Sequence, residues 1–243
     1  MRIHLLGVNG PFPESGGAAS GYLLQAEETL LQLDLGSGTL ARLTAKAAPE
    51  RLSALFLAHW HFDHVSDLPV LMYRLEAMGF GANGNRLPVY APADESSVIR
   101  RIAAASPCFD LRNVVPGDEI VFGSCRVRIG EARHPVPAVS FRAEENGRVF
   151  GYTGDTNTLP GLTDFFRGVN LLLADGLFPE EVWSEQKPHL SAALAAAMAA
   201  DAGVQQLVLT HLNPLFPPDL LLSEARRRHR NVLLAEAGRV LDI

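Results

Sequence analysis

The chain has 243 residues, a length that fits one large domain or two small ones and that suffices to bury a core. Hydrophobic residues make up 47% and charged residues 20% of the chain, which excludes a mainly disordered protein. The formal net charge of −6 disfavours binding to long nucleic acids. No apolar run is long enough for a membrane span, and no signal sequence is evident. Cys108 and Cys125 form no CxxC motif, so a disulfide scaffold and a cysteine-only zinc site are excluded. We therefore expect a cytoplasmic protein of enzyme size.

Strands and helices alternate along the chain according to its hydrophobic pattern. In the first part, the pattern predicts strands at 2–7, 21–26, 29–35, 52–58 and 87–91, and helices at 40–48, 65–78 and 94–105. In the second part, it predicts strands at 119–122, 125–132, 138–143, 149–153, 171–175 and 204–210, and helices at 192–202 and 218–228. Ser191 is the expected N-cap of the alanine-rich helix, and Gly203 ends it. No repeat or linker divides the chain, so we expect residues 1–243 to form one α/β domain with layered sheets.

The most informative segment is His59-Trp60-His61-Phe62-Asp63-His64, which directly follows a predicted strand. A single histidine is usually structural, but three imidazoles and a carboxylate within six residues are typical of a metal site. These groups are natural zinc ligands, and four of them exceed what one tetrahedral ion with an open position needs. The segment therefore favours two ions. We expect Trp60 and Phe62 to pack beneath the ligands.

Three more candidate ligands follow predicted strands elsewhere in the chain. His134 follows the strand at 125–132, Asp155 follows the strand at 149–153 through Gly154, and His211 follows the strand at 204–210. Residues at the ends of neighbouring strands would line one edge of the sheets. The repeated placement is a stronger signal for a joint site than any one residue.

The order His59-x-His61-x-Asp63-His64, His134, Asp155, His211 resembles that of the metallo-β-lactamase superfamily of dinuclear metallohydrolases. Within this superfamily, the segments 152–156, 187–191 and 208–212 are similar to the ribonuclease Z-like phosphodiesterase branch. The resemblance covers nearly the whole chain. It implies a four-layer αβ/βα sandwich, in which two mixed sheets are flanked by helices.

The resemblance also implies roles for the candidate residues. His59, His61 and His134 would bind the first metal ion, Asp63, His64 and His211 would bind the second, and Asp155 would bridge the two. Zn²⁺ suits the mixed nitrogen and oxygen ligands, with Mn²⁺ or iron as alternatives. A hydroxide held between the ions would be the nucleophile, and the family suggests that Asp63 takes its proton. His189 would bind phosphate or protonate the leaving oxygen, unless it is only a surface loop histidine.

Weaker candidates surround this set. Asp175 could orient His189 or could cap its own loop, and Asp34 could accept a hydrogen bond from a ligand imidazole or could serve only its turn. Ser20, in the glycine-rich segment 15–21, is a candidate for substrate binding; the segment lacks a Walker lysine, so a nucleoside triphosphate site is not expected. The arginines at 226–230 are better explained by a solvated helix end than by a nucleic-acid patch.

The expected activity is metal-dependent hydrolysis of small or cyclic phosphodiesters, such as cyclic nucleotides, through a metal-bridging hydroxide. One alternative is tRNA 3′-end processing, but the stretch from His134 to Asp155 is too short for the flexible arm of ribonuclease Z proper. The opening segment 6–11 also differs from the Gly-Thr-Gly form of that enzyme. Lactone or thioester hydrolysis on the same scaffold and a non-catalytic metal-binding domain are further alternatives. The expected partner is a small-molecule phosphodiester, without a membrane, and the resemblance allows a homodimer.

Overall fold

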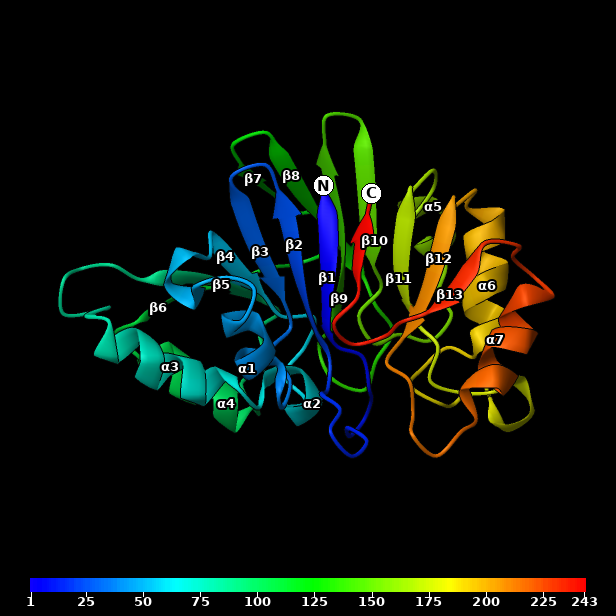
Figure 1. Ribbon diagram of the computed structural model, residues 1–243, viewed down its shortest axis with the longest axis horizontal. Helices are drawn as coiled ribbons and strands as arrows, with labels where there is room; N and C mark the ends of the chain where they lie inside the picture. The colour runs from blue at the N-terminus through cyan, green and yellow to red at the C-terminus, as the bar shows by residue number, and fades with distance from the viewer.

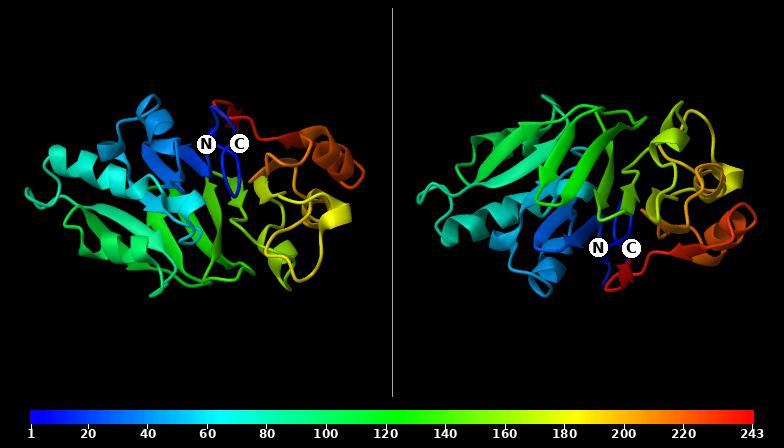
Figure 2. Two further views of the ribbon diagram at one scale, coloured as in Figure 1. Left: turned by 90° about the horizontal axis from the view of Figure 1, so that it is seen from below. Right: turned by 90° about the horizontal axis from the view of Figure 1, so that it is seen from above.

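Two seven-stranded mixed sheets stack face to face, with helices on their outer faces (Figures 1 and 2). The computed structural model describes residues 1–243. The four layers confirm the expected αβ/βα sandwich. No helix combines the length and the apolar character that crossing a membrane requires.

The first sheet is built from the N-terminal half of the chain and the last strand. Its strands, in spatial order, are β14 (Val240–Asp242), β1 (Arg2–Gly7), β2 (Gly21–Ala26), β3 (Thr29–Leu33), β4 (Ala54–Phe56), β5 (Leu87–Ala91) and β6 (Phe109–Asn113). The pairs from β14 to β3 are antiparallel, and those from β3 to β6 are parallel. Its helices are α1 (Thr39–Thr44), the short 3₁₀ turn Pro49–Arg51, α2 (Phe62–Val65), α3 (Leu68–Ala77) and α4 (Val98–Ala105).

The second sheet repeats this plan. Its strands, in spatial order, are β13 (Val232–Leu234), β12 (Gln206–Thr210), β11 (Leu171–Asp175), β10 (Arg148–Tyr152), β9 (Val139–Glu145), β8 (Cys125–Glu131) and β7 (Glu119–Phe122). The pairs from β7 to β10 are antiparallel and those from β10 to β13 are parallel. Its helical segments are α5 (Leu162–Phe165), the 3₁₀ turn Glu180–Val182, α6 (Ala192–Asp201) and α7 (Pro218–Arg226).

Three apolar layers hold the four structural layers together. The central one lies between the sheets, where the Phe56 ring stacks on Tyr90 with centroids 4.9 Å apart and meets Phe141 edge-on. One outer layer joins the first sheet to α1, α3 and α4, and the other joins the second sheet to α5, α6 and α7. Buried apolar area of this extent is the dominant stabilising contribution to such a fold.

Helix α6 shows how local sequence positions an element. The Ser191 hydroxyl accepts a hydrogen bond from the Leu194 N–H, which confirms the predicted N-cap. Most of its alanines are buried, and their small side chains let the helix pack closely on the second sheet. Gly203, with φ of 67°, follows the helix as predicted.

Several elements differ from the sequence prediction. Strands β6, β13 and β14 and helix α5 were not predicted; each is short, and the three strands lie at sheet edges, where the alternation of apolar residues is weak. The helix predicted at 94–105 begins only at Val98, because Asp94 accepts the Ser96 N–H in a turn and Ser97 is the N-cap. The helix predicted at 65–78 corresponds to α3, which begins at Leu68, and the separate short helix α2 that precedes it was not predicted.

The strand arrangement gathers several loops at one edge of the molecule. The chain leaves β4, β8, β10, β11 and β12 at this edge, which is the lower one in Figure 1. The segments that follow these five strands include all the predicted metal ligands.

Candidate metal centre

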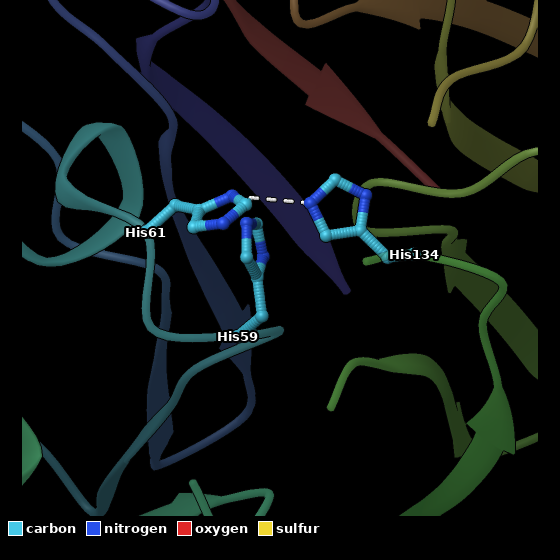
Figure 3. A group of neighbouring side chains, drawn as sticks. All are labelled: His59, His61 and His134. Atoms are coloured by element: carbon cyan, nitrogen blue, oxygen red, sulfur yellow. Dashed lines mark hydrogen bonds between the residues drawn. The ribbon is translucent and has the colours of Figure 1, made fainter. Parts of the chain in front are cut away.

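Three histidine rings form the first half of the centre. His59 and His61 come from the loop after β4, and His134 comes from the loop between β8 and β9 (Figure 3). Their ligand atoms lie within 4.8 Å of one another, and His134 Nε2 is 3.1 Å from His61 Nδ1. His59 is fully buried, whereas the other two rings are half-buried and mark the accessible side. The first sequence-predicted ligand set is therefore assembled around one point.

The second half consists of Asp63, His64, Asp155 and His211, whose ligand atoms also lie within 4.8 Å of one another. Asp63 Oδ2 is 3.0 Å from His211 Nε2. Asp155 Oδ2 lies 3.2 Å from His64 Nε2 and 3.4 Å from His211 Nε2. The same oxygen is 3.6 Å from His59 Nε2 of the first group. Asp155 thus lies between the two groups, the position expected for a bridging ligand.

The donor atoms of this cluster are suited to hold cations. His59 Nε2, His64 Nε2 and Asp155 Oδ1 belong to this cluster and are buried without a hydrogen-bond partner. A buried polar atom without a partner costs about 1–3 kcal/mol, and a cation supplies the missing interaction for nitrogen and oxygen atoms alike. The residues therefore fit divalent metal ions.

Residues around the cluster fix the orientation of its rings. His64 Nδ1 donates to Asp34 Oδ2 at 2.8 Å, which leaves Nε2 free for a metal. Asp34 also accepts the Tyr152 hydroxyl at 2.6 Å and the Ala58 N–H at 2.8 Å. His134 Nδ1 likewise lies 3.2 Å from the Pro188 carbonyl oxygen. Asp34, which the sequence suggested as an acceptor for a ligand imidazole, thus accepts a hydrogen bond from His64. It also accepts hydrogen bonds from two neighbours that are not ligands.

The pKa values reflect burial and the local carboxylates. Burial lowers the pKa of His59 and His61, and it lowers that of His134 to about 4, which favours the neutral form that binds metals. Burial also lowers the pKa of His64, but nearby carboxylates, with Asp155 first among them, raise it well above its usual value. Burial would raise the pKa of Asp155, but the neighbouring histidines hold it well below its usual range. The second half of the site therefore attracts positive charge.

His189 lies beside the cluster. Its Nδ1 donates to Asp175 Oδ2 at 2.8 Å and lies 3.9 Å from Asp155 Oδ2, and its ring stacks on His211 with centroids 5.0 Å apart. Asp175 also accepts the backbone N–H groups of Thr156 and Leu177. Asp175 therefore makes both contacts considered from the sequence, to the histidine and to its own loop.

Some contacts at the site were missed in the sequence. A Cβ atom on Gly10 would lie 2.0 Å from His211 Nε2, and one on Gly36 would lie 1.9 Å from the Asp63 carbonyl oxygen. Glycine is therefore required for close approach at both positions. Tyr152, in the segment 152–156, donates its hydroxyl to Asp34, a contact that the sequence does not reveal because the two residues are 118 positions apart.

Two expectations about neighbouring residues were wrong. Trp60 is buried and donates its Nε1–H to the Pro92 carbonyl oxygen, but Phe62 is 68% exposed and does not pack beneath the ligands. Phe62 opens the short helix α2, and the turn that brings Asp63 and His64 to the cluster directs its ring outwards. Ser20 has no exposed area, so its hydroxyl cannot contact a substrate in this conformation.

Comparisons with known proteins agree with this geometry. The model of the β-lactamase superfamily domain matches residues 32–212. A protein named ribonuclease Z from Methanosarcina acetivorans is 26% identical over an alignment of 303 positions, gaps included, which covers 100% of this chain and 98% of the relative. The uncharacterized protein Rv1339 of Mycobacterium tuberculosis is 32% identical over 93% of this chain and 86% of its own length.

The fold agrees as well. The crystal structure of the metallo-β-lactamase fold protein YhfI from Bacillus subtilis superposes with a TM-score of 0.90 and 25% identity, and it covers 99% of this chain and 98% of its own. The superfamily match begins near the end of β3 and ends at the residue after His211, so it includes the whole ligand cluster. The chain therefore belongs to the β-lactamase superfamily and is one of its metal-dependent hydrolases.

Proposed function

We propose that this hydrolase cleaves phosphodiesters at a dinuclear centre and that its substrates are small or cyclic diesters, such as cyclic nucleotides. The observation that carries the proposal is the His189–Asp175 pair, which places an imidazole that neither ligand group needs beside Asp155. Residues 1–243 would act as one hydrolase domain. Zn²⁺ is the proposed ion at both positions because the ligands are imidazoles and carboxylates.

The ligand assignment follows the two groups. His59, His61 and His134 would hold one ion, Asp63, His64 and His211 would hold the other, and Asp155 would contact both. When bound, such a pair of ions makes a water molecule more acidic and stabilises the charge of a phosphoryl group.

The protein's own residues would supply the remaining chemistry. Asp63, which is partly accessible at the cluster, would accept a proton from the attacking water. Burial lowers the pKa of His189, but the Asp175 carboxylate raises it to about 9, which favours the protonated ring. Because its Nδ1 is engaged by Asp175, its Nε2 would bind a phosphoryl oxygen or donate a proton to the leaving oxygen.

A small substrate fits the chain better than tRNA. Strands β9 and β10 and their tight turn occupy most of the segment between His134 and Asp155, which leaves no room there for a long arm. The net charge of −6 also disfavours a long polyanion. The specific observation in favour of tRNA 3′-end processing is the relative named ribonuclease Z. Its alignment with this chain runs over 303 positions, more than the 243 residues of the chain, so that relative has segments that this chain lacks.

The direct test compares substrates on the Zn²⁺- or Mn²⁺-loaded protein. We expect turnover of bis(p-nitrophenyl) phosphate and of at least one cyclic nucleotide, and loss of both in His61→Ala. His4→Gln, which changes a half-buried histidine on β1, is the matched control and should retain activity. Undiminished turnover by folded His61→Ala would refute the site. Specific cleavage of a 3′-extended precursor tRNA, or preference for lactones or thioesters, would replace the proposed substrate class.

A second comparison tests His189. A p-nitrophenolate group can leave without being protonated, whereas an alkoxide needs a proton from a general acid in order to leave. We therefore expect His189→Ala to reduce kcat for alkyl-leaving diesters by about 10²–10⁴-fold and to affect p-nitrophenyl diesters much less. Equal losses for both leaving groups would assign His189 to phosphate binding alone.

A further inference from the structure

A cavity of about 530 Å³ lies beside the metal centre, and none of the seven ligands lines it. It is enclosed by the loop after β1, the loop after β12 and the connection from β13 to β14, which meet at the lower centre of Figure 1. Gly10 donates its N–H to the Leu212 carbonyl oxygen at 3.1 Å, and Ala235 donates to Leu209 at 2.8 Å. Backbone hydrogen bonds therefore hold these segments together, so the backbone fixes the walls of the cavity.

Two buried asparagines line this cavity, and each has one unused end. Asn9 is 5% exposed; its Nδ2 donates to the Leu212 carbonyl oxygen, and its Oδ1 makes no hydrogen bond. Asn213 is 8% exposed; its Oδ1 accepts the Leu215 N–H at 2.9 Å, and its Nδ2 makes no hydrogen bond. These backbone partners assign the free atoms: Oδ1 of Asn9 and Nδ2 of Asn213. The cavity thus offers one acceptor and one donor that the protein itself does not satisfy.

The remaining lining is apolar inside and acidic at the edge. Phe216 and Leu234 are among the apolar residues of the wall. Glu14 and Glu236 are exposed carboxylates at its edge, whereas the one guanidinium, that of Arg42, already donates to the carbonyl oxygens of Leu6 and Gly16. Glu236 lies 3.9 Å from the Arg239 guanidinium, and Glu14 is a carboxylate without an ion-pair partner. Because the Arg42 guanidinium is engaged by carbonyl oxygens, the lining holds no unengaged cation for a phosphate group.

We propose that this cavity binds an uncharged nucleoside. The Asn9 acceptor and the Asn213 donor can pair with a donor and an acceptor on the edge of a nucleobase. In DNA recognition a single asparagine amide supplies the same two kinds of group to adenine. The planar ring would lie against the apolar wall, and the ribose hydroxyls would bind Glu14 and Glu236, as carboxylates do in dinucleotide sites. The volume lies within the usual range for small-molecule sites. This site is independent of the phosphodiesterase activity proposed above.

The test is calorimetric titration of the four ribonucleosides into the wild-type protein and into His61→Ala. At least one nucleoside should bind both proteins with equal affinity, and its 5′-monophosphate should bind more weakly. Asn213→Asp keeps the acceptor for the Leu215 N–H but lacks the Nδ2 donor, so it should weaken binding about tenfold or more. Asn146→Asp, in the exposed turn between β9 and β10, is the matched control and should bind like the wild type.

Any of three results would overturn the proposal. The first is that no nucleoside binds at millimolar concentration to protein that circular dichroism shows to be folded. The second is that binding is lost in folded His61→Ala. The third is that Asn213→Asp binds as tightly as the wild type. If Asn213→Asp does not fold, the double variant Glu14→Gln/Glu236→Gln replaces it, because both side chains are exposed. That variant should narrow the difference in affinity between the nucleoside and its monophosphate, and an unchanged difference would equally refute the assignment.

Discussion

Gly10→Ala offers a test of the metal centre that changes none of its ligands. Gly10 lies against the imidazole of His211, and a Cβ atom there would be 2.0 Å from Nε2, whereas real Cβ contacts are essentially never under 3.0 Å. The ring or the loop must therefore move by at least about 1 Å. Coordination geometry tolerates only about 0.2 Å, so His211 would lose its position as a ligand.

The expected result is selective loss of one ion. His59, His61 and His134 form their group without His211, so elemental analysis should find about one ion per folded chain of Gly10→Ala and two in the wild type. A displacement of 1 Å costs about 10²-fold in turnover, which we expect for bis(p-nitrophenyl) phosphate.

The matched control is Gly16→Asn, in the same loop. Gly16 has φ of 73°, a conformation that asparagine tolerates, and a Cβ atom there would have nothing within 4 Å. This variant should retain both ions and full turnover. If Gly10→Ala also retained both, His211 would not be a ligand or the loop would be free to move away, and the reasoning from close packing would be refuted.

Three further predictions concern stability. Asp34→Asn places an amide donor where His64, Tyr152 and the Ala58 N–H all donate. Urea denaturation should therefore show a loss of at least about 2 kcal/mol in the free energy of unfolding. A change under about 0.5 kcal/mol would contradict this hydrogen-bond network. Phe62→Ser should change the free energy of unfolding by no more than about 0.5 kcal/mol, because the ring is exposed. Trp60→Ala should lower it by about 3–5 kcal/mol, because the indole is buried. Comparable losses in the two variants would contradict an exposed Phe62 and a buried Trp60. Chelation should lower Tm by about 8–16 °C for each ion lost, because one ion at 1,000 times its Kd contributes about 4 kcal/mol. Zn²⁺ should restore the Tm, and a Tm independent of both additions would contradict metal binding at the cluster.

The sequence predicted which residues gather at the candidate centre, because their chemistry is unusual and their spacing is regular. His134, Asp155 and His211 each follow a strand, and strands that run in one direction in a sheet bring such residues to the same edge. This inference needs the type and order of the elements but not their exact bounds. The layered α/β architecture was predictable for the same reason.

Features that depend on distant backbone partners were not predictable. Strand β14 has only three residues and exists because it pairs with β1, at the other end of the chain. Strand β6 is partly exposed and reads as a mixed polar segment, although it pairs along its length with β5. The direction of the Phe62 ring likewise depends on where α2 begins, and a difference of one residue rotates a side chain by about 100°.

In each sheet, one residue that directly follows a strand and lies at the site has a left-handed backbone conformation. Composition does not reveal this feature. Asp34 directly follows β3 with φ of 52°, and His211 directly follows β12 with φ of 56°. The left-handed conformation costs a residue with a side chain about 1–2 kcal/mol, and glycine would avoid that cost. At both positions the side chain is the one that contacts the ligand cluster: the Asp34 carboxylate holds His64, and the His211 ring meets Asp63. The strain is therefore located where a strand must turn sharply while its next side chain still points into the centre, and it is retained because glycine would supply the turn without the functional group.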